Sequence, residues 1–244
     1  MKIHVVNPNT TASMTAKIGA AAQAVAAPGT DILAWNPPDG PASIEGFYDE
    51  AFAVPGMLRL IREAEAAGVA GHVIACFDDT GLDAARAVAA APVVGIGEAA
   101  FHMASLVAGA FSVVTTLARS IAAIEHNLAR YGLAHRCARV RAAEVPVLAL
   151  EESGSNARQH ISAEIGAAIR EDRAEAIVLG CAGMADLARA LSEEHGVPVV
   201  DGVAAAVKLV EGLGALGLRT SKRGGYAFPL PKPFSGCFAD DAPR

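Results

Sequence analysis

The sequence of this chain repeats itself at long range, and the repeat limits the folds that the chain can adopt. Three short segments recur at nearly constant offsets of 108, 105 and 106 positions. The pairs are Val5-Val6-Asn7 with Val113-Val114-Thr115, Ala75-Cys76 with Gly180-Cys181, and Pro92-Val93-Val94 with Pro198-Val199-Val200. Any α/β protein repeats strand–turn–helix units, but here a cysteine occupies the same place in both copies. We therefore expect two α/β lobes related by pseudo-two-fold symmetry.

Short β-branched runs alternate along the chain with longer segments that are rich in Ala and Leu and have a helical period. Strands are expected at 2–6, 30–34, 72–75, 93–96, 111–114, 139–142, 176–179 and 198–200. Helices are expected near 13–26, 48–67, 81–90, 98–107, 118–131, 155–170, 184–194 and 203–215. Near-continuous apolar strands that alternate with helices indicate parallel sheets covered on both faces. The prediction is an α/β fold in which each lobe has a mostly parallel sheet flanked by helices.

The 244 residues suffice for two small lobes with a sizeable core. We expect residues 1–98 together with 208–244 to form the first lobe, and residues 99–207 to form the second. Binding crevices of open α/β sheets form at the carboxyl edge, where Cys76 and Cys181 follow their strands. Two lobes that face each other would bring both thiols to one active site between them.

Charge and cysteine usage exclude several function classes. A net charge of −6 argues against nucleic acid as a partner, and Lys222-Arg223 is too small a basic group to change this. The N-terminus leads directly into a β-like run, and no stretch is long and apolar enough to span a membrane, so we expect a cytoplasmic protein. The four cysteines show no CxxC or zinc-like spacing, and the seven histidines are scattered. We therefore expect free thiols and no metal.

The two matched thiols indicate proton transfer at carbon. Removing a proton next to a carbonyl needs a base near that proton and stabilisation of the enolate, and a second acid on the opposite face inverts the centre. Cys76 and Cys181 both precede a predicted helix, whose free N–H groups would favour the thiolate. Two near-attack contacts place the sulfurs roughly 7–9 Å apart. Cys137 and Cys237 lack this symmetry and are expected to be small core residues.

Several polar residues near the predicted carboxyl edges could contact a substrate or could only cap helices. Thr10 or Thr11 would be an ordinary N-cap in the turn after the first strand, although the turn's position also suits substrate contact. Asp78, Asp79 and Thr80 have the same two interpretations, with Asp78 close enough to Cys76 to touch substrate.

Other motifs are weaker. Gly95-Ile96-Gly97 lacks the third glycine of a dinucleotide-binding turn, so no dinucleotide is expected there. Glu98 and His102 are expected at the surface or in packing. The Pro- and Gly-rich loop around residues 43–46 could cover a cleft, and no chemical role is assigned to it.

Five segments of the chain resemble hydantoin racemases, a family within the aspartate/glutamate racemase superfamily, and the resemblance spans nearly the whole chain. They are NPNTTASM, PASIEGFYDE, ACFDDTGLDAAR, VLGCAGM and GLRTSKRGGYAFPLPKPF. The resemblance implies a two-lobed α/β fold and racemisation at C5 of a 5-monosubstituted hydantoin, with no cofactor. It also implies that Cys76 and Cys181 are the two acid/base residues.

The same resemblance implies further substrate contacts. Asn7 stands where the superfamily's first-strand polar residue contacts substrate, and Thr115 and Thr116 stand at the matching place of the second lobe. Amino-acid racemases of the superfamily usually show Cys-Asn-Thr and Cys-Thr at the two thiols. Here Phe77 and Asp78 follow the first thiol, and Ala182 and Gly183 follow the second, so a neutral ring with N–H groups is favoured over a free amino acid. These four residues are expected to bind the substrate.

Three alternatives remain open at this point. A similar allantoin racemase would use the same mechanism, so the small-molecule substrate is a hydantoin or a ureide. A maleate-type isomerase would use one thiolate as a nucleophile on a dicarboxylate, for which no Arg cluster is evident. A ligand-binding protein without enzymatic activity would need no thiol pair. We also expect a homo-oligomer.

Overall fold

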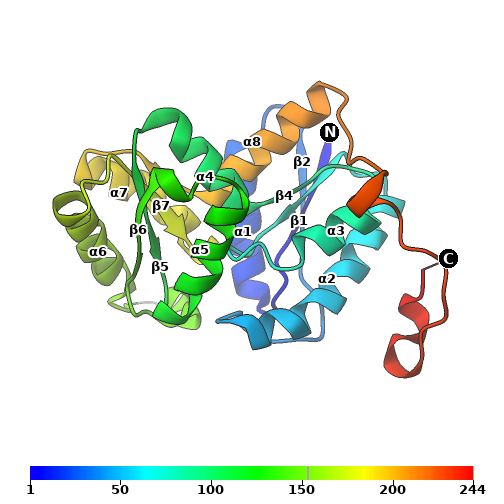
Figure 1. Ribbon diagram of the computed structural model, residues 1–244. Helices are drawn as coiled ribbons and strands as arrows, with labels where there is room; N and C mark the ends of the chain where they lie inside the picture. The colour runs from blue at the N-terminus through cyan, green and yellow to red at the C-terminus, as the bar shows by residue number, and fades with distance from the viewer. Residues whose placement is uncertain (153, 244) are drawn as a thin grey trace.

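Two four-stranded sheets form the framework of the computed structural model, which describes residues 1–152 and 154–243 (Figure 1). The first sheet has the order β2-β1-β3-β4 and the second has the order β6-β5-β7-β8. The strands are β1 (Lys2–Val6), β2 (Asp31–Trp35), β3 (Gly71–Ile74), β4 (Val93–Gly95), β5 (Phe111–Thr115), β6 (Cys137–Ala142), β7 (Ala176–Gly180) and β8 (Val199–Val200). All pairings are parallel, and the two orders correspond strand for strand. The predicted two-lobed α/β fold is confirmed.

Eight α-helices flank the two sheets within the described residues. They are α1 (Ala12–Val25), α2 (Phe47–Ala66), α3 (Leu82–Val88), α4 (Ile96–Val107), α5 (Ile121–Arg130), α6 (Ala157–Glu171), α7 (Ala188–His195) and α8 (Gly202–Ala215). The predicted helices 118–131 and 184–194 begin as 3₁₀-helices instead: η1 (Ala118–Ser120) and η4 (Ala182–Leu187). None of the helices in the described ranges is long and apolar enough to cross a bilayer.

Helices α4 and α8 join the lobes by exchanging places. Helix α4 follows the first sheet in sequence but contacts β7 and β8, whereas α8 follows the second sheet and contacts β3 and β4. The two helices also pack against each other, as Figure 1 shows at the centre of the molecule. One buried cluster therefore runs through both lobes, with Phe101 of α4 stacked on Phe111 of β5 at 6.1 Å between ring centroids. The exact residues at which one lobe gives way to the other stay a prediction.

A chain of buried polar side chains crosses the first sheet. His4 and His72 are register partners on β1 and β3, and their Nδ1 atoms lie 3.1 Å apart. The Nε2 of His72 lies 3.0 Å from Glu65, which also accepts the backbone N–H groups of Ala90 and Ala91. Burial, with His72 as a lesser cause, lowers the pKa of His4 to about 3. The side chains of His4 and His72 are both fully buried.

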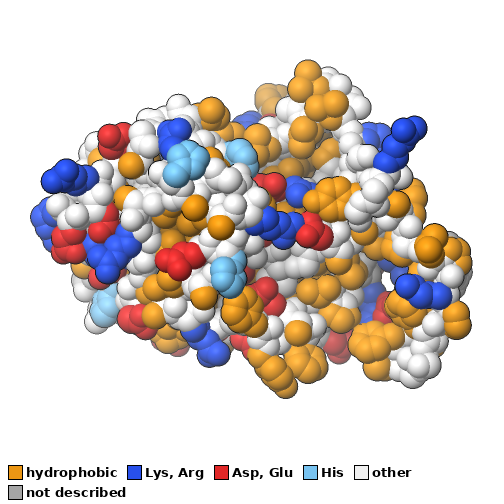
Figure 2. All heavy atoms as spheres, in the orientation of Figure 1, with side chains coloured by type: hydrophobic (Ala, Val, Ile, Leu, Met, Phe, Trp, Pro, Cys, Tyr) orange, Lys and Arg blue, Asp and Glu red, His pale blue; other side chains and the backbone are white. Residues whose placement is uncertain are grey.

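The chain ends in a long tail that extends away from both sheets (Figure 1). Lys222 fixes its start by donating to the carbonyl oxygens of Arg86 and Ala87, and an Arg59–Asp241 ion pair of 2.7 Å fixes its end. Large apolar side chains on the tail are exposed, and Figure 2 shows them gathered at the right of the molecule. They are Phe228, Leu230, Phe234 and Phe238. Cys237 is exposed there too, so the prediction of a core residue was wrong.

Candidate functional site

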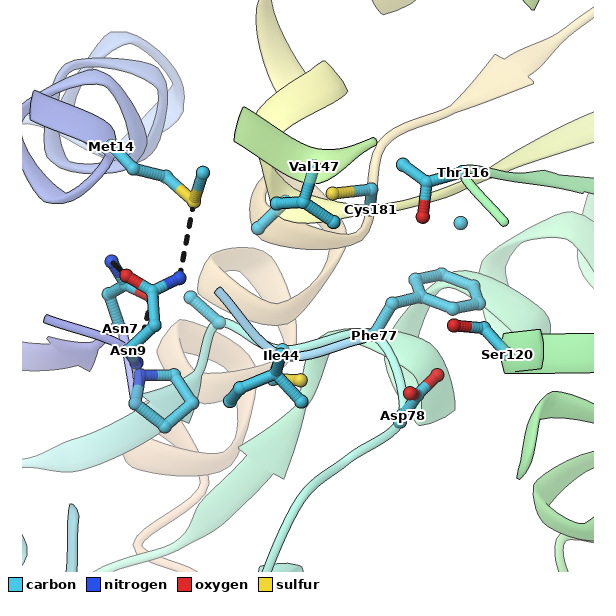
Figure 3. Close-up of a pocket in the computed structure, with 15 residues that line it drawn as sticks. Asn7, Asn9, Met14, Ile44, Phe77, Asp78, Thr116, Ser120, Val147 and Cys181 are labelled. Atoms are coloured by element: carbon cyan, nitrogen blue, oxygen red, sulfur yellow. Dashed lines mark hydrogen bonds between the residues drawn. The ribbon is translucent and has the colours of Figure 1, made fainter. Parts of the chain in front are cut away.

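A cavity lies between the carboxyl edges of the two sheets, and residues of both lobes line it (Figure 3). The first lobe contributes Asn7, Pro8, Asn9, Met14, Ile44, Ala75, Cys76, Phe77 and Asp78. The second contributes Thr116, Ser120, Val147, Gly180, Cys181 and Ala182. About 40 Å³ of this space is open to water, which is room for on the order of three water molecules. Both symmetric thiols thus line one cavity, as the repeat predicted.

Cys76 lies in the turn between β3 and α3. Its sulfur accepts the backbone N–H of Asp78 and, at 3.1 Å, the hydroxyl of Thr80. Helix α3 begins only at Leu82, so the thiol does not stand at a helix N-terminus. Burial, together with the nearby Asp78 carboxylate, raises the pKa of Cys76 well above its usual value. The expected lowering of this pKa was therefore wrong, because desolvation outweighs the two donors.

Cys181 directly follows β7 and stands at the N-cap position of η4. Its sulfur accepts the backbone N–H of Gly183, which corresponds to the contact that Asp78 makes with Cys76. Burial nevertheless raises the pKa of Cys181 to about 11. A 3₁₀ turn with one donor does not compensate for the loss of water around a thiolate. Both thiols therefore favour the protonated form.

Asp78 supplies the carboxylate that lines the cavity. Burial, with the neighbouring Glu50 and Asp79 as lesser causes, raises its pKa to about 7. Its backbone carbonyl accepts the side-chain amide of Asn127, which ties the Cys76 turn to α5 of the other lobe. The carboxyl group can therefore change protonation near neutral pH, beside a thiol.

Asp79 serves the fold rather than the cavity. Its carboxylate accepts the backbone N–H groups of Gly97 and Glu98 at 2.9 and 2.8 Å, and so caps the start of α4. The hydroxyl of Tyr131 donates to it as well, at 2.8 Å. A Cβ at Gly97 would lie 2.4 Å from the carbonyl oxygen of Phe77. The glycines of the GxG sequence thus make room for this cap.

Phe77 and Ala182 both line the cavity, directly after their thiols. The ring of Phe77 packs edge-on against Phe101 at 5.4 Å, so most of this side chain belongs to the core between the lobes. Gly183 reaches the site through its N–H alone. A Cβ there would lie 2.9 Å from Leu150.

The turn after β1 holds the cavity-lining amides in place. The Nδ2 of Asn7 donates to Asn9 at 2.9 Å and to Thr15 at 3.0 Å. Thr11 occupies the N-cap position of α1, but its hydroxyl donates to the carbonyl oxygen of Ala42 instead of capping. The predicted N-cap position is therefore confirmed for Thr11, but its hydroxyl fastens the loop that follows β2 and makes no capping hydrogen bond.

This loop covers the cavity, as its composition indicated. Ile44 points into the space, and the side chain of Glu45 accepts the backbone N–H of Val147 from the second lobe at 2.9 Å. One loop of the first lobe is thereby fastened across the cleft.

Thr115 and Thr116 occupy different places. Thr116 lines the cavity, whereas the buried hydroxyl of Thr115 donates to the carbonyl oxygen of Gly180 at 3.0 Å. Thr115 therefore links β5 to β7 instead of facing the cavity.

Sequence reasoning missed Ser120 and Val147, which no motif marks because they come from connections after β5 and β6. The sequence could have indicated Asn9, because this residue belongs to the same NPNTT turn as Asn7.

Comparison with known proteins extends over the whole chain. Residues 3–210 match the family model described as Asp/Glu/Hydantoin racemase. A hydantoin racemase of Rhizobium meliloti is 52% identical over 97% of this chain and 98% of its own length. The structure of allantoin racemase from Klebsiella pneumoniae superimposes with a TM-score of 0.97 at 53% identity and covers 100% of both chains. A Picrophilus torridus aspartate racemase, 13% identical with a TM-score of 0.63 over 91% of this chain and 96% of its own, shares the fold. The chain therefore belongs to the Asp/Glu/hydantoin racemase family and is a racemase.

Proposed function

We propose that the enzyme inverts C5 of 5-monosubstituted hydantoins by two-base proton transfer between Cys76 and Cys181, without a cofactor. One observation carries the proposal: the two thiols follow corresponding strands of the two lobes and line the same cavity. An expected separation of roughly 7–9 Å between the sulfurs would leave room for one carbon between them.

In each turnover one thiolate takes the C5 proton and becomes a thiol. The electron pair of the C–H bond moves into the ring carbonyl as an enolate, and the other thiol donates its proton to the opposite face of C5. The second thiol thus becomes the thiolate, and the next turnover can run in reverse. Burial makes each thiolate a stronger base than in water, which suits a weakly acidic C–H bond.

The cavity lining favours an uncharged ring. Within the described chain its charged member is the Asp78 carboxyl group, and its polar members include the amides of Asn7 and Asn9. An acceptor suits the ring N–H groups, while a free amino acid would need a cation for its carboxylate.

Allantoin is the second candidate substrate, and a specific observation favours it. The similar Klebsiella pneumoniae structure is that of an allantoin racemase, and an allantoin racemase from Pseudomonas fluorescens is 43% identical with a TM-score of 0.91 over 97% of this chain and 100% of its own. The maleate isomerase of Pseudomonas putida, at 19% identity, shares only the fold, so it supports no dicarboxylate substrate.

The test is chiral chromatography of pure enantiomers of allantoin and of several 5-alkyl and 5-aryl hydantoins. We expect racemisation of at least one ring substrate, none of free aspartate or glutamate, and activity that survives EDTA. Cys76→Ala and Cys181→Ala should each abolish racemisation. Rapid racemisation of glutamate with inert hydantoins would overturn the substrate class, and a single variant that keeps near-normal racemisation would overturn the two-thiol mechanism.

The proposal also has a consequence for the cellular compartment in which the enzyme works. Two free thiols at the site call for a reducing compartment, so we place the enzyme in the cytoplasm, with a small molecule as its substrate. Alkylation should abolish activity, and a reductant should restore it after mild oxidation of the thiols.

A further inference from the structure

The two thiols have corresponding positions but unequal hydrogen-bond donors. Each sulfur accepts the backbone N–H of the residue two positions further on, which is Asp78 for Cys76 and Gly183 for Cys181. The sulfur of Cys76 also accepts the hydroxyl of Thr80, a buried side chain, at 3.1 Å. At the offset of 105 that relates the thiols, the residue equivalent to Thr80 is Ala185, which has no hydroxyl.

The charged neighbours have the opposite effect: they disfavour the thiolate of Cys76 more than that of Cys181. The carboxylates of Asp78 and Glu50 lie near Cys76, and both disfavour its thiolate. At Cys181 the carboxylates of Asp78 and Glu45 also disfavour the thiolate, but the cation Lys17 partly offsets them. With backbone donors alone, Cys76 would be the harder of the two thiols to ionise. A two-base racemase uses each thiol as the base in one direction. Such a difference in ionisation would therefore slow the proton removal for which Cys76 is the base.

We propose that Thr80 is a positioning residue that donates its hydroxyl to the Cys76 thiolate and thereby offsets the neighbouring carboxylates. The inference rests on the proposed function and adds to it an explanation of how the two thiols come to ionise with similar ease. A hydroxyl can rotate, so Thr80 donates to the thiolate and accepts from the thiol. Together with the Asp78 N–H it occupies two directions around the sulfur and leaves the others for the cavity. Thr80 does not line the cavity and acts through Cys76.

Overall kinetics cannot isolate this effect. The equilibrium constant of a racemisation is one, so kcat/KM must remain equal in the two directions for every variant. Half-reactions can isolate it, because a variant with a single site thiol can exchange the C5 hydrogen of only one enantiomer with solvent deuterium. Thr80→Val should therefore be introduced into Cys181→Ala, where Cys76 is the remaining base, and into Cys76→Ala, where Cys181 is.

We expect Thr80→Val to slow deuterium exchange by Cys76 about 10- to 100-fold, the range for a hydrogen bond to a charged group, and to change exchange by Cys181 less than about 2-fold. Thr80→Ser, which retains the hydroxyl, should restore most of the rate. Thr30→Val removes another buried threonine hydroxyl, far from the cavity, and should change neither exchange rate. Equal slowing of both thiols, or slowing by the serine variant as large as by valine, would overturn the inference.

A measurement without substrate separates this inference from the proposed function. The alkylation rate of Cys76 at a fixed alkaline pH, followed by mass spectrometry of its peptide, should fall about 10-fold or more in Thr80→Val, while that of Cys181 stays constant. If this result holds but neither single-thiol variant exchanges any hydantoin or allantoin, the proposed function fails and the role of Thr80 stands. An unchanged alkylation rate of Cys76 would refute the role of Thr80 itself.

Discussion

Asp78 is the carboxyl group that can meet a substrate's ring N–H. We expect Asp78→Ala to lower kcat/KM for the preferred ring substrate roughly 10- to 200-fold, because a hydrogen bond to a charged group is lost. Asp83→Ala removes an exposed carboxylate from the start of α3 and should leave kcat/KM within about 2-fold. Steady-state kinetics by polarimetry would measure both. Wild-type rates in Asp78→Ala would remove Asp78 from substrate binding.

The thiols should react slowly at neutral pH. Because burial raises the pKa of Cys181 to about 11, its thiolate fraction in the free enzyme should grow about tenfold per pH unit between pH 7 and 9. Its alkylation rate, followed by peptide mass spectrometry, should grow in proportion. A rate that levels off below pH 8 would show that the pKa of Cys181 is lowered instead of raised.

His4 should make the fold sensitive to acid. Its folded-state pKa of about 3 lies below the unfolded value of 6.5, so the unfolded chain binds the proton first as the pH falls. Stability from this residue is complete above pH 6.5 and is lost on the way down to pH 3, by about 2 kcal/mol at pH 5. Urea unfolding at pH 7 and pH 5 would measure the loss. His4→Gln, which does not titrate, should lose less over this interval.

At the scale of elements, the strands and most helices could be predicted because apolar runs and the long repeat specify them. The 3₁₀-helix after Cys181 could not, because its sequence, AGMADL, is compatible with an α-helix. The tight packing there is also visible only in the folded chain, where a Cβ at Gly183 would lie 2.9 Å from Leu150 of a distant connection. The thiols were predictable from symmetry, whereas Ser120 and Val147 enter the cavity from connections without a motif. The raised thiol pKa values depend on burial, which only the folded chain shows.

Two helical glycines should respond oppositely to the same substitution. Gly97→Ala places a Cβ 2.4 Å from the carbonyl oxygen of Phe77 and should destabilise the protein by about 1–3 kcal/mol, since the Cys76 turn must move. Gly212→Ala in α8 meets no atom within 4 Å and should be neutral or stabilising by up to about 1 kcal/mol. Thermal and urea unfolding would compare them. Equal effects would contradict the tight contact between the turn and α4.

The loop that covers the cavity depends on Glu45. We expect Glu45→Ala to raise KM for the ring substrate about 3- to 30-fold, because the loop loses its hydrogen bond to the Val147 N–H across the cleft. The free energy of unfolding should change by less than about 1 kcal/mol, because only one partly buried hydrogen bond is lost. Glu152→Ala in the second lobe serves as the control. An unchanged KM would mean that the loop stays in place without this contact.

At the scale of the whole molecule, the tail is the least covered part of the chain. Its four apolar side chains are exposed, and Phe234 and Phe238 lie in one pocket with Val54, Pro55 and Leu58 of α2. We expect the chain to self-associate through these apolar side chains. Sedimentation should show an oligomer that Phe234→Ser together with Phe238→Ser weakens, while Lys232→Ser does not. A monomer at micromolar concentration would contradict this expectation.

The exchanged helices α4 and α8 have a consequence for dividing the molecule. A cut in the connection at Gly109, between α4 and β5, would leave each piece with one sheet and with the helix that covers the sheet of the other piece. Each piece alone would leave part of its sheet uncovered, and each carries the helix that the other lacks. Two separately encoded halves should therefore assemble into a working racemase when they are produced in the same cell, and each should be insoluble when it is produced alone.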